Sequence, residues 1–130
     1  MENILVPVSP GEVLDKITIL EIKFERMTDP DKVANVRTEL ELLRETWQKA
    51  INDDDVIQRL HDELKTINEA LWEIEDDIRD KERVKEFDER FIELARAVYF
   101  TNDKRSQIKK QLNLHLGSQI IEEKSYQDYS

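Results

Sequence analysis

One unbroken hydrophobic alternation constrains this chain more than any other feature. Apolar side chains recur at steps of three and four residues between positions 57 and 78. The positions are Ile57, Leu60, Leu64, Ile67, Leu71, Ile74 and Ile78. This spacing places them on one face of an α-helix, and seven successive matches favour a long helix in a bundle or a coiled-coil seam.

Start signals followed by similar alternations predict three further helices. The four predicted helices cover residues 9–27, 29–51, 55–84 and 88–116. The first two begin with a capping residue, Ser9 or Asp29, that is followed directly by proline. Asp88 caps the fourth, and Gly117 is a typical residue just beyond a helix end.

The two ends of the chain are predicted to lie outside the helices. Pro7 fixes the backbone and removes a hydrogen-bond donor, so residues 1–8 are expected to form a short extended arm. Residues 122–130 are polar and are expected to form a mobile tail. We therefore predict one helical domain over residues 1–130.

The predicted fold class is all-α: an antiparallel four-helix bundle, or helical hairpins, with a coiled-coil-like pair formed by the long third and fourth helices. Two glycines and three prolines are too few for a many-turned β fold. Short connections favour antiparallel neighbours. The long third and fourth helices extend beyond the short first and second ones, so part of their apolar face stays uncovered. A second copy can cover this face, and we therefore expect a homodimer or higher homo-oligomer.

Charge and composition exclude several function classes. The chain has 30 acidic and 20 basic side chains and a net charge of −10, which disfavours nucleic acid and anionic membrane surfaces. The absence of cysteine excludes disulfides and thiolate chemistry. No apolar run approaches the ~18 residues of a membrane span, and no secretory signal is present, so we expect a cytoplasmic protein.

Polar residues interrupt the apolar face of the fourth helix at Thr101 and Arg105. If the third and fourth helices form a hairpin, these positions face a polar part of the third helix. The predicted ligand-binding cluster is Asp15, Lys16, Asn68, Glu69, Trp72, Glu73, Thr101, Asn102, Arg105 and Lys109. One interpretation is a structural Arg105–Glu69 pair that fixes register or a dimer interface. The other is a pocket for phosphate or carboxylate, with Trp72 as a wall.

Catalytic and metal-binding patterns are largely missing from the sequence. Glu73 and Asp76 lie one helical turn apart and are compatible with magnesium, but the only Glu-x-x-Glu spacing, at residues 86–89, lies at the solvated hairpin tip. His61 and His115 have no second ligand at metal-binding spacing. Motifs for phosphate-binding loops, dinucleotides and serine hydrolases are also absent. We predict no catalytic residues, metal or cofactor.

Several segments resemble a small bacterial and phage family that is catalogued only as a domain of unknown function. They are PVSPGE (7–12), DKITILEIK (15–23), LWEIEDDIR (71–79), ELARAVY (93–99), TNDKRSQIKK (101–110) and EKSY (123–126). The resemblance spans nearly the full length and implies a stand-alone helical protein. It implies no established catalytic residues.

Two function hypotheses follow. The first is a non-enzymatic, homo-oligomeric interaction module for a partner protein or a small anionic ligand. The alternative is a small helical enzyme or a binder of nucleotides or nucleotide sugars, in which Lys16, Arg105 and Lys109 hold the anion and Glu73 or Asp76 performs acid–base or metal chemistry.

Overall fold

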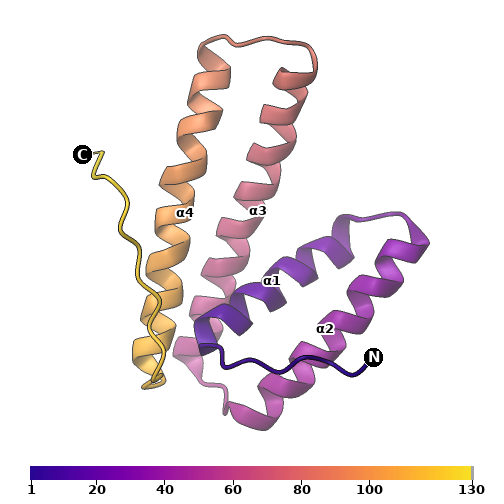
Figure 1. Ribbon diagram of the computed structural model, residues 1–130, viewed down its shortest axis with the longest axis vertical. Coiled ribbons are helices and arrows are strands. Elements are labelled where there is room, and N and C mark those ends of the chain that lie inside the picture. Colours follow the sequence, from indigo (N-terminus) through magenta and orange to yellow (C-terminus); the bar gives the residue numbers. More distant parts are fainter. Residues whose placement is uncertain (130) are drawn as a thin grey trace.

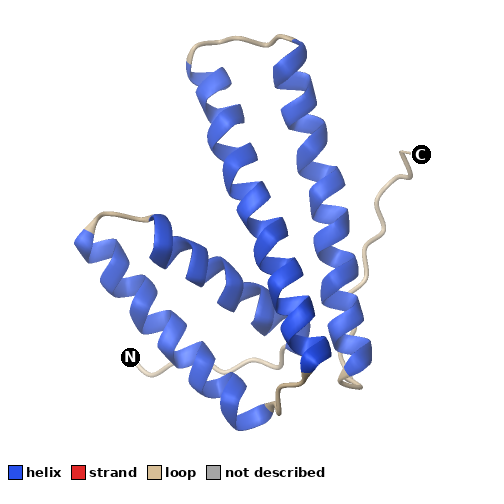
Figure 2. Ribbon diagram, turned by 180° about the vertical axis from the view of Figure 1, so that it is seen from behind, coloured by secondary structure: helices blue, strands red, loops and turns tan. Residues whose placement is uncertain are grey.

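The computed structural model describes residues 1–129 and consists of four α-helices in that part of the chain (Figures 1 and 2). The helices are α1 (Pro10–Arg26), α2 (Pro30–Ala50), α3 (Asp55–Arg83) and α4 (Glu89–His115). The all-α prediction is confirmed, and each helix ends within one residue of its expected bounds. Ser130, the last residue of the predicted mobile tail, lies outside the described residues.

Local capping explains where the helices begin. The residue before each helix accepts a backbone N–H of the first turn with its side chain. The four caps are Ser9, Asp29, Asp54 and Asp88. Each cap satisfies one of the backbone donors that a helix start leaves free. Gly117, just beyond α4, adopts a φ of 63°, a left-handed conformation that glycine enters without steric cost.

The helices form two antiparallel hairpins, α1–α2 and α3–α4, that splay apart from a common base (Figure 1). Helix α1 packs against the other three helices, whereas the backbone of α2 approaches α1 alone. The bundle is therefore more open than an arrangement in which every sequential pair is adjacent. The reason lies in α1, which buries Ile17 and Leu20 and, on another side, Ile22, and so occupies the centre.

The apolar core lies in the base, where both hairpins contribute. The lower part of the α3 alternation, at Ile57, Leu60 and Leu64, is completely or almost completely buried. Buried Trp47 of α2 extends this core and donates its indole N–H to Asp53 at 2.9 Å. Since α1 and α2 cover only the base, the upper part of the α3 alternation is only half-buried.

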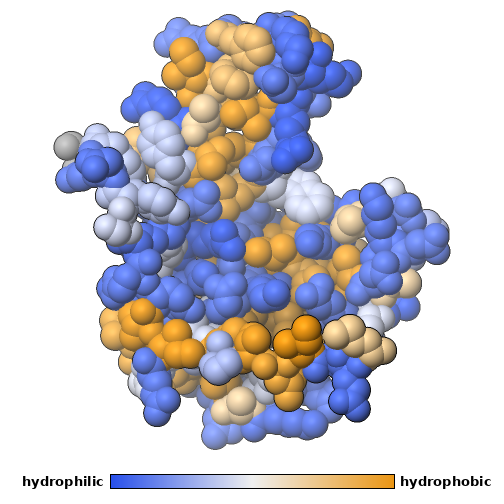
Figure 3. Space-filling view, viewed as in Figure 1, coloured by the Kyte–Doolittle hydropathy of each residue, from blue (hydrophilic) through white to orange (hydrophobic). Residues whose placement is uncertain are grey.

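The upper half of the α3–α4 hairpin projects beyond the other helices. We call residues 71–100 the projecting hairpin. Leu94 is its only buried residue, and the structure describes the whole segment. Val84, Phe87 and Ile92 are each more than half exposed. Figure 3 shows this hydrophobic surface along the upper part of the molecule.

A polar junction holds α1, α2 and α3 together on the base. Glu21 of α1 accepts hydrogen bonds from Arg44 of α2 at 2.9 Å and contacts His61 of α3 at 2.7 Å. The hydrogen bond to Glu21 raises the pKa of His61, against the opposing effect of burial. Burial alone raises the pKa of Glu21, but His61 and Arg44 outweigh it and lower the pKa.

This junction predicts a pH-dependent stability. Because the pKa of His61 is raised on folding, the protonated imidazole adds to the free energy of unfolding. This stabilisation is fully present below the ordinary histidine pKa of about 6.5 and is lost as pH rises through the higher pKa of the folded state. Conversely, the Glu21 contribution is present above about pH 4.5 and is lost as pH falls through its lowered pKa. The free energy of unfolding of the wild type should exceed that of His61→Gln by about 1 kcal/mol near pH 5.5.

Urea unfolding of both proteins at pH 5.5 and pH 8.5 measures this effect. The gap between wild type and His61→Gln should shrink at the higher pH. A gap of equal size at both pH values would show that the charged imidazole does not stabilise the junction.

Candidate functional site

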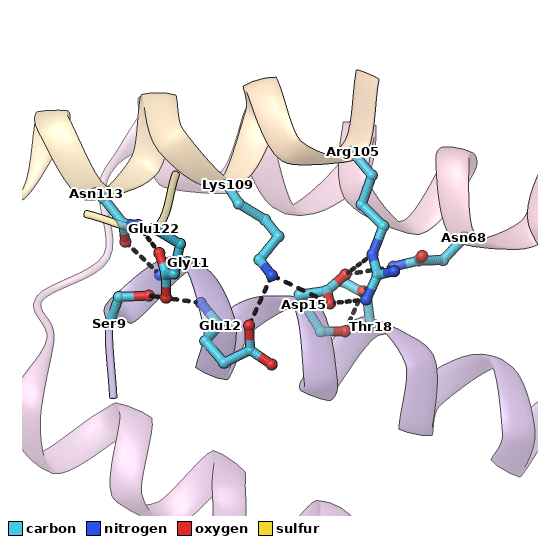
Figure 4. A network of polar contacts seen from close by, with 10 residues as sticks. All are labelled: Ser9, Gly11, Glu12, Asp15, Thr18, Asn68, Arg105, Lys109, Asn113 and Glu122. Atoms are coloured by element: carbon cyan, nitrogen blue, oxygen red, sulfur yellow. Dashed lines mark hydrogen bonds and ion pairs between the residues drawn. The ribbon is translucent and has the colours of Figure 1, made fainter. Parts of the chain in front are cut away.

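The polar interruption in α4 belongs to a network centred on a buried carboxylate of α1. Asp15 is completely buried where α1 packs into the groove between α3 and α4. Its Oδ1 accepts hydrogen bonds from Nδ2 of Asn68 and Nε of Arg105, each at 2.9 Å, and its Oδ2 accepts a second bond from Arg105 (Figure 4). Three helices thus meet at one carboxylate.

The expected Arg105–Glu69 pair is wrong, because Arg105 binds Asp15 instead. Glu69 lies 3.7 Å from Arg26, on a more exposed part of α3. The inward direction of Arg105 follows from periodicity within α4. Its partner depends on how α1 sits along the α3–α4 groove, which spacing within the hairpin does not reveal.

The remaining buried polar atoms around Asp15 are also paired. The Thr18 hydroxyl donates to the Asp15 carbonyl at 2.7 Å and accepts from Asn68 at 3.0 Å. Within the described part of the chain, every buried side-chain nitrogen and oxygen has a hydrogen-bond partner. The hydrogen bond to Asp15 raises the pKa of Arg105, against the lowering effect of burial. The network is therefore satisfied without any added ligand.

Lys109 extends this network by one helical turn along α4. Its Nζ binds Glu12 at 2.6 Å and lies 4.0 Å from Asp15 (Figure 4). Two cations, Arg105 and Lys109, thus face two carboxylates of α1. Because the charges balance, the site has no net positive charge with which to attract an anion.

A second polar cluster joins the start of α1 to the end of α4 and the tail. Asn113 accepts the Gly11 N–H at 2.7 Å and donates to Glu122 at 2.8 Å, and Glu122 also binds the Ser9 hydroxyl. A Cβ on Gly11 would lie only 2.6 Å from the Lys109 carbonyl, so the two helices approach more closely than a larger residue permits. Burial raises the pKa of Glu122, but these hydrogen bonds lower it overall.

Sequence reasoning missed this second cluster as part of the site. Asn113 could have been predicted, because its spacing of four residues from Lys109 and eight from Arg105 places it on the same face of the helix. Glu122 could not, because it follows the helix end and its position depends on how the tail folds back.

The other predicted site residues do not join the Asp15 network. Lys16 is exposed. Glu73 is exposed and pairs with Arg26, whose guanidinium also lies 5.8 Å from the centre of the Trp72 ring. Thr101 and Asn102 are half-buried on α4, but neither is among the hydrogen-bonded partners of Asp15. The ten residues therefore fall into three sets. Asp15, Asn68, Arg105 and Lys109 form the Asp15 network; Glu69, Trp72 and Glu73 contact Arg26; and the other three, Lys16, Thr101 and Asn102, belong to neither group.

Next to the network lies a small, mostly apolar groove of about 250 Å³. Leu71 and Trp72 line it from α3, and its polar lining residues are Asn68, Glu75 and Arg105. The described residues contain no group of three or more side chains placed to hold a metal ion. The geometry fits a structural network that fixes α1 on the α3–α4 hairpin.

This structural role predicts that Arg105→Leu lowers the free energy of unfolding by roughly 3 kcal/mol, because it leaves the buried Asp15 carboxylate without its main partner. The double variant Asp15→Leu/Arg105→Leu should recover most of the loss, since both charges are then removed. Urea unfolding at pH 7 measures both effects.

Lys104→Leu is a matched control on the same helix, because Lys104 is exposed. It should change stability by less than about 0.5 kcal/mol. An Arg105→Leu variant as stable as this control would mean that the pair does not hold α1 in place.

Comparison with known proteins agrees with the resemblance in the sequence. No curated protein and no solved structure matches the chain significantly. No helix of the described residues has the length and apolar character needed to span a membrane. The family described as "Family of unknown function (DUF6165)" matches residues 4–129, and the chain belongs to this family.

Proposed function

We propose that this protein is a homo-oligomeric helical interaction module whose projecting hairpin pairs with the projecting hairpin of a second copy. The observation that carries this proposal is the exposure of Val84, Phe87 and Ile92 on the outer part of this hairpin. These residues lie beyond the part that Arg26 of α1 and Tyr129 of the tail contact. Large apolar side chains that protrude from a polar surface are typical of protein interfaces. A second hairpin laid against this one completes a four-helix bundle.

The distribution of charge supports a second copy as the partner. The projecting hairpin carries ten acidic and six basic side chains, and its four unbalanced carboxylates all lie within residues 73–77, at its lower end. Its outer part, residues 78–100, carries six acidic and six basic side chains and is balanced. Two identical hairpin ends can therefore approach without net repulsion, while the acidic bases repel one another. A strongly acidic or basic partner would gain little from a balanced surface.

The size of the projecting hairpin sets the expected affinity. Its two helical segments are each roughly 20 Å long and lie side by side, which gives a face of ~20 by 20 Å. Such a face, ~400 Å² on each copy and ~800 Å² in total, is smaller than the ~1,200 Å² at the low end of stable protein interfaces, so the proposed dimer is a weak one. We therefore expect a dimer that dissociates in the micromolar range.

Anion binding and catalysis have less support. In the alternative of an enzyme or nucleotide binder, an anion would be held by Arg105 and Lys109. Both side chains instead hydrogen-bond to carboxylates of their own chain. Lys16 is not beside them in the network. The cytoplasmic location and the bacterial or phage origin stay predictions.

Sedimentation equilibrium of the full chain at 5–200 µM tests the dimer. The wild type should reach twice the chain mass, and Ile92→Glu should raise the dissociation constant at least tenfold, because it places a charge at an exposed apolar position of the hairpin. Helical content measured by circular dichroism should not change.

Leu42→Glu provides the matched control, since Leu42 is a similarly exposed apolar residue on α2, away from the projecting hairpin. It should leave the dissociation constant unchanged. A monomeric wild type at 200 µM, or equal weakening by both variants, would contradict the proposed interface.

A further inference from the structure

A second feature lies between α4 and the C-terminal tail; it shares Tyr99 with the lower end of the projecting hairpin but does not depend on pairing with a second copy. A cleft of about 670 Å³ opens there, in the size range of small-molecule sites. Three tyrosines line it: Tyr99 from α4, and Tyr126 and Tyr129 from the tail. The same cleft includes the carboxylates of Asp103 and Asp128 and the ammonium group of Lys124.

The tail that forms one wall of the cleft is fixed at both ends. At the start, Glu122 binds Ser9 and Asn113, and Glu123 pairs with Lys110 at 2.9 Å. At the far end, the Tyr129 hydroxyl donates to Asp103 at 2.5 Å. The segment predicted to be mobile therefore contacts α4 at positions between residues 99 and 113.

Ring packing strengthens the contact at the far end. The Tyr129 ring lies 5.3 Å from that of Tyr99 and 4.7 Å, edge to face, from that of Phe100. The hydrogen bond with Asp103 raises the pKa of Tyr129 to about 12, so its hydroxyl stays protonated and keeps donating. The wall of the cleft is thus held by tilted and edge-to-face ring contacts as well as by a hydrogen bond.

The cleft has the chemistry of a cation site. Aromatic ring faces carry negative electrostatic potential and attract ammonium groups. Two carboxylates against one lysine give the lining a negative balance. The chain's own Lys124 already uses this attraction, because its Nζ lies 5.4 Å from the centre of the Tyr126 ring. A cation from solution is further favoured by the overall charge of −10.

We propose that the cleft between α4 and the tail binds a small organic cation, a quaternary or protonated ammonium group held against tyrosine faces beside Asp103. An anion is disfavoured by the carboxylates, and a neutral apolar molecule would gain nothing from them. A metal ion is disfavoured because the cleft brings together only two carboxylates, and the described residues hold no group of three or more acidic, histidine or cysteine side chains placed for a metal.

Choline and its neutral carbon analogue 3,3-dimethylbutan-1-ol test the inference on the full chain, since they differ mainly in charge. Choline should shift the tyrosine ring resonances in NMR spectra saturably, with a dissociation constant in the millimolar range, as expected for exposed rings. The neutral analogue should bind at least tenfold more weakly. Equal binding of the two, or no saturable shift up to 100 mM choline, would overturn the proposal.

Tyr126→Leu tests whether choline binds in this cleft. Because Tyr126 is 79% exposed, the substitution removes one ring of the lining without disturbing the fold. This variant should bind choline two- to fivefold more weakly, and Asp103→Asn should weaken binding further by removing a charge. Phe87→Leu removes an aromatic ring far along the chain, at the projecting hairpin, and should leave the affinity unchanged. Equal loss in Tyr126→Leu and Phe87→Leu would show that choline binds aromatic surface without selecting the cleft.

Discussion

Burial of the Asp15 carboxylate is the constraint on which the arrangement of the two hairpins depends. A carboxylate without water must be paired, and its partners come from different helices: Asn68 on α3 and Arg105 on α4. A shift of α1 by one turn, about 5.4 Å, would move the carboxylate away from both. Apolar packing alone tolerates such shifts far better. The polar network therefore selects one position of α1 among several that would bury similar apolar area.

The position of α1 also determines what remains uncovered. Helix α1 has 17 residues and α3 has 29, so α1 cannot cover the whole hairpin even if it lay parallel to it. It packs at the base, where Gly11 allows the closest approach to α4. With α1 at the base, apolar residues at the far end of α3 and α4, such as Val84 and Ile92, stay more than half exposed. The buried core and the exposed apolar surface are thus divided between the two ends of one helical hairpin.

The local parts of this structure were predictable from sequence, and the non-local parts were not. Caps such as Ser9 and Asp88 act within one turn, so the helix bounds followed from the sequence alone. The inward direction of Arg105 followed from the interrupted periodicity of α4. Its partner did not, because pairing across 90 residues depends on tertiary packing. Lys16 was included beside Asp15, but adjacent helical residues point about 100° apart, and Lys16 is exposed.

The separation of Asp15 and Arg105 along the chain has a consequence for synthesis. The α1–α2 hairpin emerges before α3 and α4 and can form from contacts close in sequence, but its Asp15 carboxylate has no Arg105 partner until 90 more residues have been made. Until then water must remain around Asp15, and the groove between the hairpins cannot close. The growing chain therefore acquires its native base only after α4 has been made, and Glu122 joins it later still.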